Sequence, residues 1–353
     1  MAPYVPIVPF EVLSARFGLA PDDIVKLDAN ENPYGPPPAA IEALRSARYL
    51  HIYPDPEANA LRDALSATLG LSKELLLAGM GADELIDLVL RALIEPGDAV
   101  LDCPPSFGMY PFSAAVNGAT YVTIPRDEAF ALDVDGIEQA VRSTPRAKVL
   151  FVCSPNNPDG SVVSDEVLLR LLALPVVVVL DEAYVDFAEV DGVASRMGWV
   201  RQHDNLVVLR TFSKLAGLAG LRIGYGAFPP WLLEQLWKIK QPYNVSVAAS
   251  AAAVAALSEL DWMRDKLAAI VTERKRMISD LADIASLRAY PSYSNFVLFR
   301  LQGKPAKQLQ QELAEQGIMV RHFGKPGLSD CIRISAGRPE QTDRVVAALH
   351  AML

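Results

Sequence analysis

The chain has little cysteine, no excess of positive charge and no long hydrophobic run. Its three cysteines, Cys103, Cys153 and Cys331, are widely spaced among 353 residues, so neither a disulfide framework nor a CxxC metal site is available. The net charge of −9 would repel polyanions, which argues against nucleic acid or an anionic membrane surface as a partner. We therefore expect reduced thiols, no metal and a cytoplasmic protein, in which any bound anion is held by a local site.

Membrane insertion and secretion are not indicated either. The longest apolar runs, 171–180 and 245–257, are shorter than the ~20 residues that cross a bilayer. The N-terminal stretch has three prolines and no basic segment before an apolar one, unlike a signal peptide. We interpret both apolar runs as buried core.

Strand-type and helix-type patterns alternate through the first two thirds of the chain. Apolar residues recur at helical spacing in segments such as 83–94. Several of the strand candidates are continuous Val/Leu runs, which is typical of strands buried on both faces of a mainly parallel sheet. This pattern predicts an α/β fold. The strand candidates are 75–79, 99–103, 119–124, 148–154, 176–181, 205–210 and 221–228.

The pattern of predicted helices and strands changes after residue 245. A long helical stretch, about 245–284, precedes a strand–helix–strand–strand–helix succession that ends at residue 353. We expect a large domain over 28–250 and a smaller α+β domain made of 1–27 and 260–353. The helix around 245–284 would join them.

Two loops at predicted strand ends could hold a ligand, because ligands of open α/β sheets bind at the carboxyl ends of the strands. GMGADELI (79–86) leads from a strand into a helix, whose N-terminus can bind a phosphate. SPNNPDG (154–160) places two asparagine amides on a stiff loop. Each motif is also compatible with an ordinary turn.

Two more strand ends carry charged groups. Asp181 ends the run VVVVLD, where a carboxylate is costly unless it meets a cation, and Tyr184 follows three residues later. A helix-capping role for Asp181 is the alternative. Lys214 lies in RTFSKLAGLAGLRIGYG (210–226), close to Thr211, Ser213 and Arg222, which are plausible phosphate ligands. No carboxylate occurs in that stretch, although a lone lysine is most often a surface residue.

The combination of these groups matches the requirements of pyridoxal 5′-phosphate (PLP). The aldehyde of this cofactor needs an amine, its phosphate needs a helix N-terminus with arginine and hydroxyls, and its ring nitrogen needs a carboxylate. The motifs above offer one candidate for each requirement.

The chain resembles the fold-type I PLP-dependent aminotransferases, and within them the histidinol-phosphate aminotransferase group. This resemblance covers essentially the whole chain. It implies a large domain with a seven-stranded, mainly parallel sheet, and a small α+β domain. The motifs that carry it are APYVP (2–6), KLDANENPYGPP (26–37), IYPDP (52–56), GMGADELI (79–86), CPPSFGMY (103–110), CSPNNPDG (153–160), DEAYVDF (181–187), TFSKLAGLAGLRIGY (211–225) and CIRISAGRPE (331–340).

The resemblance also implies roles for individual residues. Lys214 would condense with the cofactor aldehyde, Asp181 would pair with the ring nitrogen, and Tyr184 with Asn157 would hydrogen-bond the ring's phenolic oxygen. Phe107 would stack on the ring. The phosphate would be held by the backbone at Gly81, Ala82 and Asp83, by the side chains of Thr211, Ser213 and Arg222, and by Tyr53 of a neighbouring subunit. The anionic end of the substrate would be bound by Tyr4, Asn157, Arg321 and Arg333.

The implied reaction is transamination between histidinol phosphate and 2-oxoglutarate, which yields imidazole acetol phosphate and glutamate in histidine biosynthesis. Lys214 would remove the α-proton and return it to the C4′ carbon of the cofactor, and desolvation with Arg222 nearby would lower the pKa of its amine. A homodimer with shared active sites is implied too.

Three departures from the usual pattern concern specificity. Phe107 replaces a tyrosine, Asp159 lies where a threonine is usual, and IVPFEV follows APYVP in place of GKP. Two other enzymes share the cofactor residues, an aromatic amino-acid aminotransferase and a threonine-phosphate decarboxylase. A PLP-binding regulator without turnover is a distant alternative, since such proteins carry an N-terminal DNA-binding domain and only about thirty residues precede the cofactor domain here.

Overall fold

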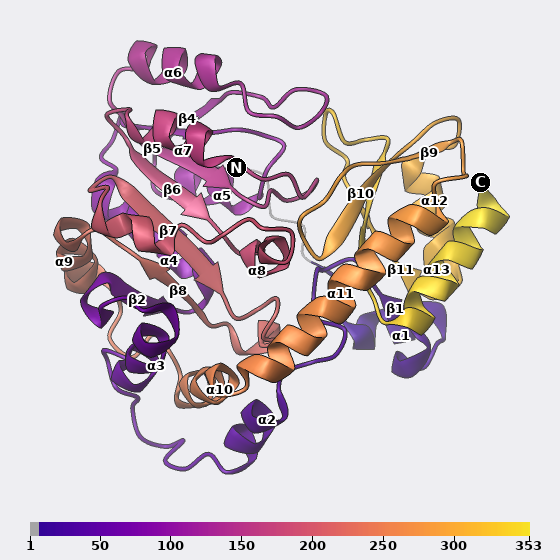
Figure 1. Ribbon diagram of the computed structural model, residues 1–353, viewed down its shortest axis with the longest axis horizontal. Coiled ribbons are helices and arrows are strands. Elements are labelled where there is room, and N and C mark those ends of the chain that lie inside the picture. Colours follow the sequence, from indigo (N-terminus) through magenta and orange to yellow (C-terminus); the bar gives the residue numbers. More distant parts are fainter. Residues whose placement is uncertain (1–6) are drawn as a thin grey trace.

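A seven-stranded sheet forms the centre of the larger part of the molecule (Figure 1). The computed structural model describes residues 7–353. The strand order is β2-β8-β7-β6-β5-β3-β4. β8 runs antiparallel to both of its neighbours, β2 and β7, and all other pairs in this sheet are parallel. All seven predicted strands are present, so the predicted mainly parallel sheet is confirmed. The strands are β2 (Leu76–Gly79), β3 (Ala99–Asp102), β4 (Thr120–Thr123), β5 (Ala147–Cys153), β6 (Val177–Asp181), β7 (Leu206–Thr211) and β8 (Gly224–Ala227).

Helices cover both faces of this sheet. One face carries α4, α5 and α9, and the other carries α3, α6, α7 and α10. The helices are α1 (Phe10–Phe17), α2 (Pro38–Arg45), α3 (Asn59–Leu69), α4 (Gly81–Leu93), α5 (Met109–Val116), α6 (Val134–Ser143), α7 (Asp165–Leu172), α8 (Val185–Glu189), α9 (Pro230–Ile239), α10 (Val247–Leu257), α11 (Leu260–Asp280), α12 (Ala306–Glu315) and α13 (Pro339–Met352).

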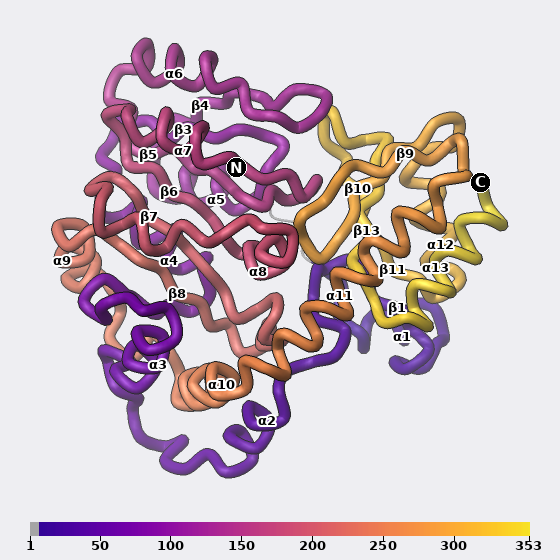
Figure 2. The backbone as a smooth tube through the Cα atoms, viewed as in Figure 1, coloured from indigo at the N-terminus to yellow at the C-terminus, as the bar shows by residue number. Residues whose placement is uncertain are grey.

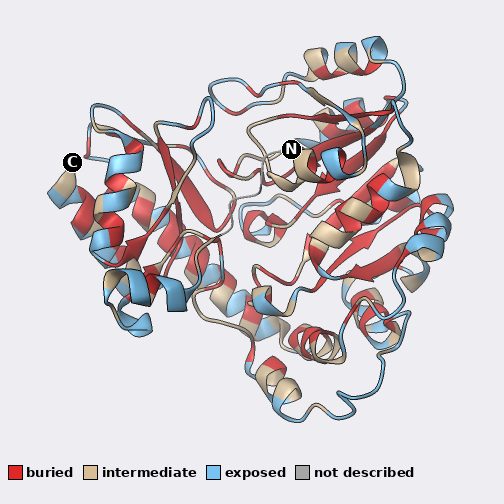
Figure 3. Ribbon diagram, turned by 180° about the vertical axis from the view of Figure 1, so that it is seen from behind, coloured by how far each residue is buried: buried red, intermediate tan, exposed pale blue. Residues whose placement is uncertain are grey.

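The Val/Leu runs of the sequence are the buried central strands. Successive side chains of a strand point to opposite faces, so Val178 packs in one hydrophobic cluster and Val179 in the other. Both side chains are fully buried. Figure 3 shows the same burial along the central strands. A run without polar alternation is therefore what a strand covered on both faces requires.

The smaller part contains a four-stranded antiparallel sheet, β12-β13-β10-β9, and a two-stranded parallel pair, β1-β11. Its core joins these strands to α11, α12 and α13. The N-terminal segment belongs to this side, since Val25 pairs with Ile318. We propose that the two parts are separate domains. The strands are β1 (Val25–Lys26), β9 (Leu287–Ala289), β10 (Phe296–Leu301), β11 (Ile318–Met319), β12 (Arg321–His322) and β13 (Cys331–Ser335).

Two predicted elements are divided in the structure. The helical stretch 245–284 forms α10 and α11, separated at Ser258 and Glu259, because α10 packs on α2 while α11 runs to the smaller part (Figure 2). The single strand expected after α12 is interrupted at Val320, because β11 pairs with β1 whereas β12 pairs with β13. The short strand β9 was not predicted.

The connection from β7 to β8 packs tightly against the chain that enters α2. Gly217 has a φ of +65°, and a Cβ built there would lie 2.4 Å from the carbonyl oxygen of Gly35. Gly220 in the same connection has no atom within 4 Å of such a Cβ. Of these two glycines, only Gly217 is therefore required by the structure.

We expect Gly217→Ala to lower the free energy of unfolding by about 2 kcal/mol or more, because it combines backbone overlap with an unfavourable left-handed conformation. Urea denaturation of the purified protein measures this change. Gly220→Ala is the matched control and should change stability by less than about 0.5 kcal/mol. Equal effects of the two substitutions would contradict this account of the loop.

Candidate active site

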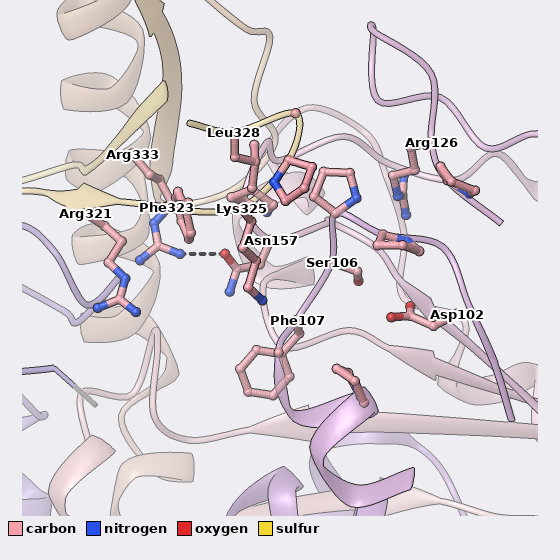
Figure 4. Close-up of a pocket in the computed structure, with 18 of the residues that line it drawn as sticks. Asp102, Ser106, Phe107, Arg126, Asn157, Arg321, Phe323, Lys325, Leu328 and Arg333 are labelled. Atoms are coloured by element: carbon pink, nitrogen blue, oxygen red, sulfur yellow. Dashed lines mark hydrogen bonds between the residues drawn. The ribbon is translucent and has the colours of Figure 1, made fainter. Parts of the chain in front are cut away.

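A cavity of about 720 Å³ lies between the carboxyl edge of the large sheet and the smaller part of the molecule. The large sheet contributes Phe107, Asn157, Tyr184 and Lys214, each from a loop that follows a strand. Arg321 and Arg333 come from β12 and β13 on the opposite side (Figure 4). The structure thus brings together predicted residues that are separated by more than two hundred positions in the sequence.

Lys214 follows β7 and faces this cavity. Its Nζ atom donates a hydrogen bond to the carbonyl oxygen of Ala29 at 3.3 Å and lies 5.4 Å from the ring centre of Tyr184. No carboxylate among residues 7–353 is within salt-bridge distance of it. Desolvation, followed by the positive charge of Arg333, lowers the pKa of the amine to about 8. Arg222, which was predicted to lower this pKa, contributes less to the lowering than Arg333 does.

Asp181 is the last residue of β6 and is buried. Its Oδ1 accepts a hydrogen bond from the backbone N–H of Ala183 at 3.0 Å, and its Oδ2 accepts one from the hydroxyl of Tyr110 at 2.7 Å. Burial raises the pKa of this carboxyl group, while the two donors oppose the rise. A cation placed beside Asp181 would offset the cost of burying its charge.

Tyr184 and Asn157 reach the cavity from the loops after β6 and β5. The Tyr184 hydroxyl accepts a hydrogen bond from the side-chain amide of Asn30 at 3.0 Å. The Oδ1 of Asn157 accepts one from Arg333 at 2.5 Å, which is drawn in Figure 4. Asn157 lines the cavity, and its side-chain N–H groups are donors that a ligand there could accept from. Asn30 was not predicted, although it lies in the quoted motif KLDANENPYGPP.

The predicted phosphate cradle lies at the start of α4. Gly81, Ala82 and Asp83 form the first turn of this helix, whose backbone N–H groups have no partner within the helix. Arg222 reaches this turn, and its guanidinium forms an ion pair with the Asp83 carboxylate at 2.9 Å. A Cβ on Gly224 would lie 2.5 Å from the nitrogen of Ala82, so β8 also approaches this turn closely.

Thr211 and Ser213 flank this cradle on the β7 connection. The Thr211 hydroxyl accepts a hydrogen bond from the backbone N–H of Ser213 at 3.0 Å and donates one to the carbonyl oxygen of Ile223 at 3.5 Å. These bonds fix the turn just before Lys214. Their predicted contact with a phosphate stays a prediction.

Arg321 and Arg333 are direct cross-strand neighbours in the β12–β13 pair. Two like charges at such a position are destabilising, and a bound anion relieves the repulsion. Arg333 is buried and donates to the carbonyl oxygen of Asp28 at 2.7 Å as well as to Asn157. Tyr4, the remaining residue predicted for this anion, lies outside the described residues.

Tyr53 does not contribute to the cavity of its own chain. Its side chain is 79% exposed and stacks on Tyr243, with ring centres 4.7 Å apart. The exposed ring can meet another subunit, as its predicted role requires. That role stays a prediction.

Asp159, one of the three departures, is buried and hydrogen-bonded within its own loop. Its carboxylate accepts hydrogen bonds from the side-chain amide of Asn156 at 2.5 Å and from the backbone N–H of Ser161 at 2.8 Å. These bonds therefore link Asn156 to Ser161 across the asparagine loop.

The donor set fits PLP. An amine with a lowered pKa, a buried carboxylate, hydrogen-bond donors from Asn157 and Tyr184, and a helix N-terminus beside an arginine are the groups that this cofactor requires.

Comparisons with known proteins agree with this arrangement. The model of the family described as aminotransferase class I and II matches residues 22–349. The chloroplastic histidinol-phosphate aminotransferase of Nicotiana tabacum is 54% identical over 99% of this chain and 84% of its own length. The histidinol-phosphate aminotransferase of Roseiflexus castenholzii is 49% identical over 99% of this chain and 95% of its own length.

A solved structure gives the same result. The histidinol-phosphate aminotransferase of Sinorhizobium meliloti, determined in complex with pyridoxal 5′-phosphate, superimposes with a TM-score of 0.88 and 31% identity. The match covers 99% of this chain and 96% of that one. The chain therefore belongs to the class I and II aminotransferases, and within them to the histidinol-phosphate aminotransferase family. The resemblance indicated by the motifs is confirmed.

The lowered pKa of Lys214 leads to a test on the cofactor-free protein. Because only the neutral amine is nucleophilic, competitive acetylation of Lys214, read by peptide mass spectrometry, should rise with pH around a midpoint of about 8. Arg333→Gln removes a nearby positive charge and should move this midpoint upward. A midpoint near 10.5, the ordinary value for lysine, would contradict the assignment.

Proposed function

We propose that the chain is a PLP-dependent aminotransferase that converts histidinol phosphate and 2-oxoglutarate into imidazole acetol phosphate and glutamate. The observation that carries this proposal is the placement of Lys214 and the arginine pair, Arg321 and Arg333, on one cavity. Transamination of a phosphorylated amine needs both an amine that is readily neutral and a site for the substrate anion.

PLP, when bound, supplies an aldehyde for the substrate amine and a ring that accepts electron density. Lys214 would hold the cofactor and, when free, its neutral amine would take up the α-proton of the substrate and return it to the cofactor. Asp181 would keep the ring nitrogen protonated. Tyr184 and Asn157 would bind the phenolic oxygen, and Phe107 would cover one face of the ring.

The phosphate of PLP would be held at the start of α4. The N–H groups of Gly81, Ala82 and Asp83 would donate to it, with Thr211, Ser213 and Arg222 beside them. Arg222, which is paired with Asp83 in the structure, would turn to the phosphate, a dianion that the helix N-terminus also attracts.

The arginine pair would hold the anionic end of each substrate in turn. A guanidinium binds a phosphate or a carboxylate with the same two-pronged geometry, so histidinol phosphate and 2-oxoglutarate can share the position. Arg333 also donates a hydrogen bond to Asn157, and this contact would couple the substrate anion to the phenolic oxygen of the cofactor. Tyr4 would join this anion site.

We expect the holoenzyme to lose the visible absorption of the lysine-bound cofactor fastest with histidinol phosphate as amino donor. Stopped-flow half-reactions with histidinol phosphate, phenylalanine, tyrosine and threonine phosphate measure this preference. Release of carbon dioxide from threonine phosphate would favour a decarboxylase, and a faster reaction with phenylalanine would favour an aromatic aminotransferase. Lys214→Ala is the control, and it should lack the visible band in every reaction.

We also propose a homodimer that shares its active sites. An apolar, exposed strip formed by Tyr49, Leu50, Ile52 and Tyr53 lies on one face, and Met80, next to the phosphate cradle, is 53% exposed. Arg222 and Asp83 are themselves partly exposed at the cradle. A second copy that covers these residues would bring its Tyr53 to the phosphate and bury the strip.

Light scattering should therefore give the mass of two chains. Tyr53→Phe should raise the Kd for PLP by about tenfold, since one hydrogen bond to a charged group is lost, while the dimer persists. Tyr49→Phe changes a hydroxyl in the same strip and is the control. A monomer, or equal effects of the two substitutions, would remove the role of Tyr53.

We also propose a cytoplasmic location. No helix within residues 7–353 is both long enough and apolar enough to cross a membrane. Cys103, Cys153 and Cys331 are free thiols and all are buried. These reduced thiols support a cytoplasmic location, although the Nicotiana tabacum relative is named as chloroplastic.

A further inference from the structure

We propose that Tyr110 is a positioning residue, which orients the Asp181 carboxylate toward the cofactor ring nitrogen and so maintains the proton on that nitrogen. This inference rests on the proposed function, because it concerns the proposed cofactor. Tyr110 lies outside the set of residues that the motifs assigned to the site.

The geometry around Asp181 fixes its carboxylate from two directions. Tyr110, from α5, donates to Oδ2 at 2.7 Å, and the backbone of Ala183, after β6, donates to Oδ1 at 3.0 Å. Each oxygen therefore has one donor from a different element, and each keeps a second acceptor position. The plane of the carboxylate cannot rotate without breaking one of these bonds, so a remaining lone pair has a fixed direction for the ring N–H.

The Tyr110 ring is itself held in place. It is fully buried and stacks on Phe151, with ring centres 4.5 Å apart and planes inclined by 4°. Its edge meets Phe107 at 5.6 Å and 83°. Tyr110 thus contacts two groups that would serve the cofactor ring, Phe107 at its face and Asp181 at its nitrogen.

The direction of the hydrogen bond follows from burial. Desolvation and the neighbouring Asp181 raise the pKa of the Tyr110 hydroxyl well above its ordinary value, so this group stays protonated and donates. Donation favours the ionised form of Asp181, which burial disfavours. An ionised carboxylate is the partner that keeps a pyridinium nitrogen charged.

Other titratable groups also face Asp181 from the elements around it. Asp83 on α4 raises its pKa, and Lys214 after β7 lowers it. The Cys153 thiol on β5 and the Tyr184 hydroxyl lie close enough to interact with its charge, and burial keeps both of them neutral. Among these groups, Tyr110 is the side chain that makes a direct hydrogen bond to Asp181.

Tyr110→Phe removes only the hydroxyl and keeps the stacked ring. In the holoenzyme loaded with PLP labelled with ¹⁵N in its ring, we expect the nitrogen resonance to move toward that of an unprotonated pyridine. We also expect kcat to fall roughly tenfold or more, with little change in KM for the amino donor, as for the loss of one hydrogen bond to a charged group.

Tyr121→Phe is the matched control. The Tyr121 hydroxyl donates to another buried carboxylate, Asp102, at 2.5 Å. Both residues line the cavity, but Asp102 lies on β3, two strands away from Asp181 on β6. Loss of this bond should lower thermal stability to a similar degree without moving the ring-nitrogen resonance. Asp181→Asn provides a second comparison, because Tyr110→Phe should reduce kcat much less in that background if it acts through Asp181.

An unchanged nitrogen resonance in Tyr110→Phe, an equal shift in Tyr121→Phe, or additive effects of Tyr110→Phe and Asp181→Asn would overturn the proposal. Failure of the function itself gives a different result. If the cofactor assignment failed, the wild-type protein would not bind PLP or form the visible band. If only the substrate assignment failed, another amino donor would react fastest in the half-reactions. Failure of the Tyr110 inference leaves both results intact.

Discussion

The cost of desolvating an ammonium group without a counter-ion is the constraint on which this site depends. Lys214 has the carbonyl oxygen of Ala29 and the face of Tyr184 as neighbours, and the positive charge of Arg333 adds to the cost of protonating it. A carboxylate at this position would stabilise the charged amine and remove its nucleophilicity. The proposed anion-binding arginines would therefore serve a second purpose, since their positive charge helps to keep the lysine neutral.

The functional groups of the candidate site meet at the carboxyl edge of the large sheet. Asp181 is the last residue of β6, and Asn157 and Lys214 follow its two parallel neighbours, β5 and β7. Such neighbours can be predicted from sequence, because Val/Leu runs identify the strands and parallel strands end at the same edge. For this reason the amino-acid pattern alone predicts that Asp181 and Lys214 lie at one edge of the sheet.

Other contacts could not be inferred, because local patterns do not specify partners that are distant in the chain. Asn30 meets Tyr184 across 154 positions, and Tyr110 meets Asp181 across 71. The interruption at Val320 is of the same kind. The apolar pattern around it predicts a strand, but which of two sheets each half joins depends on β1 and β13.

Lys214 and Arg222 belong to one short connection between two paired strands. The ends of this connection are joined where the N–H of Phe212 donates to the carbonyl oxygen of Ile223 at 3.1 Å, and Leu218 folds back to bond Phe212 at 3.0 Å. Local backbone geometry therefore sets the distance between the Lys214 amine and the Arg222 guanidinium. Insertions in other loops would leave this distance unchanged, whereas a single residue added within this connection would alter it.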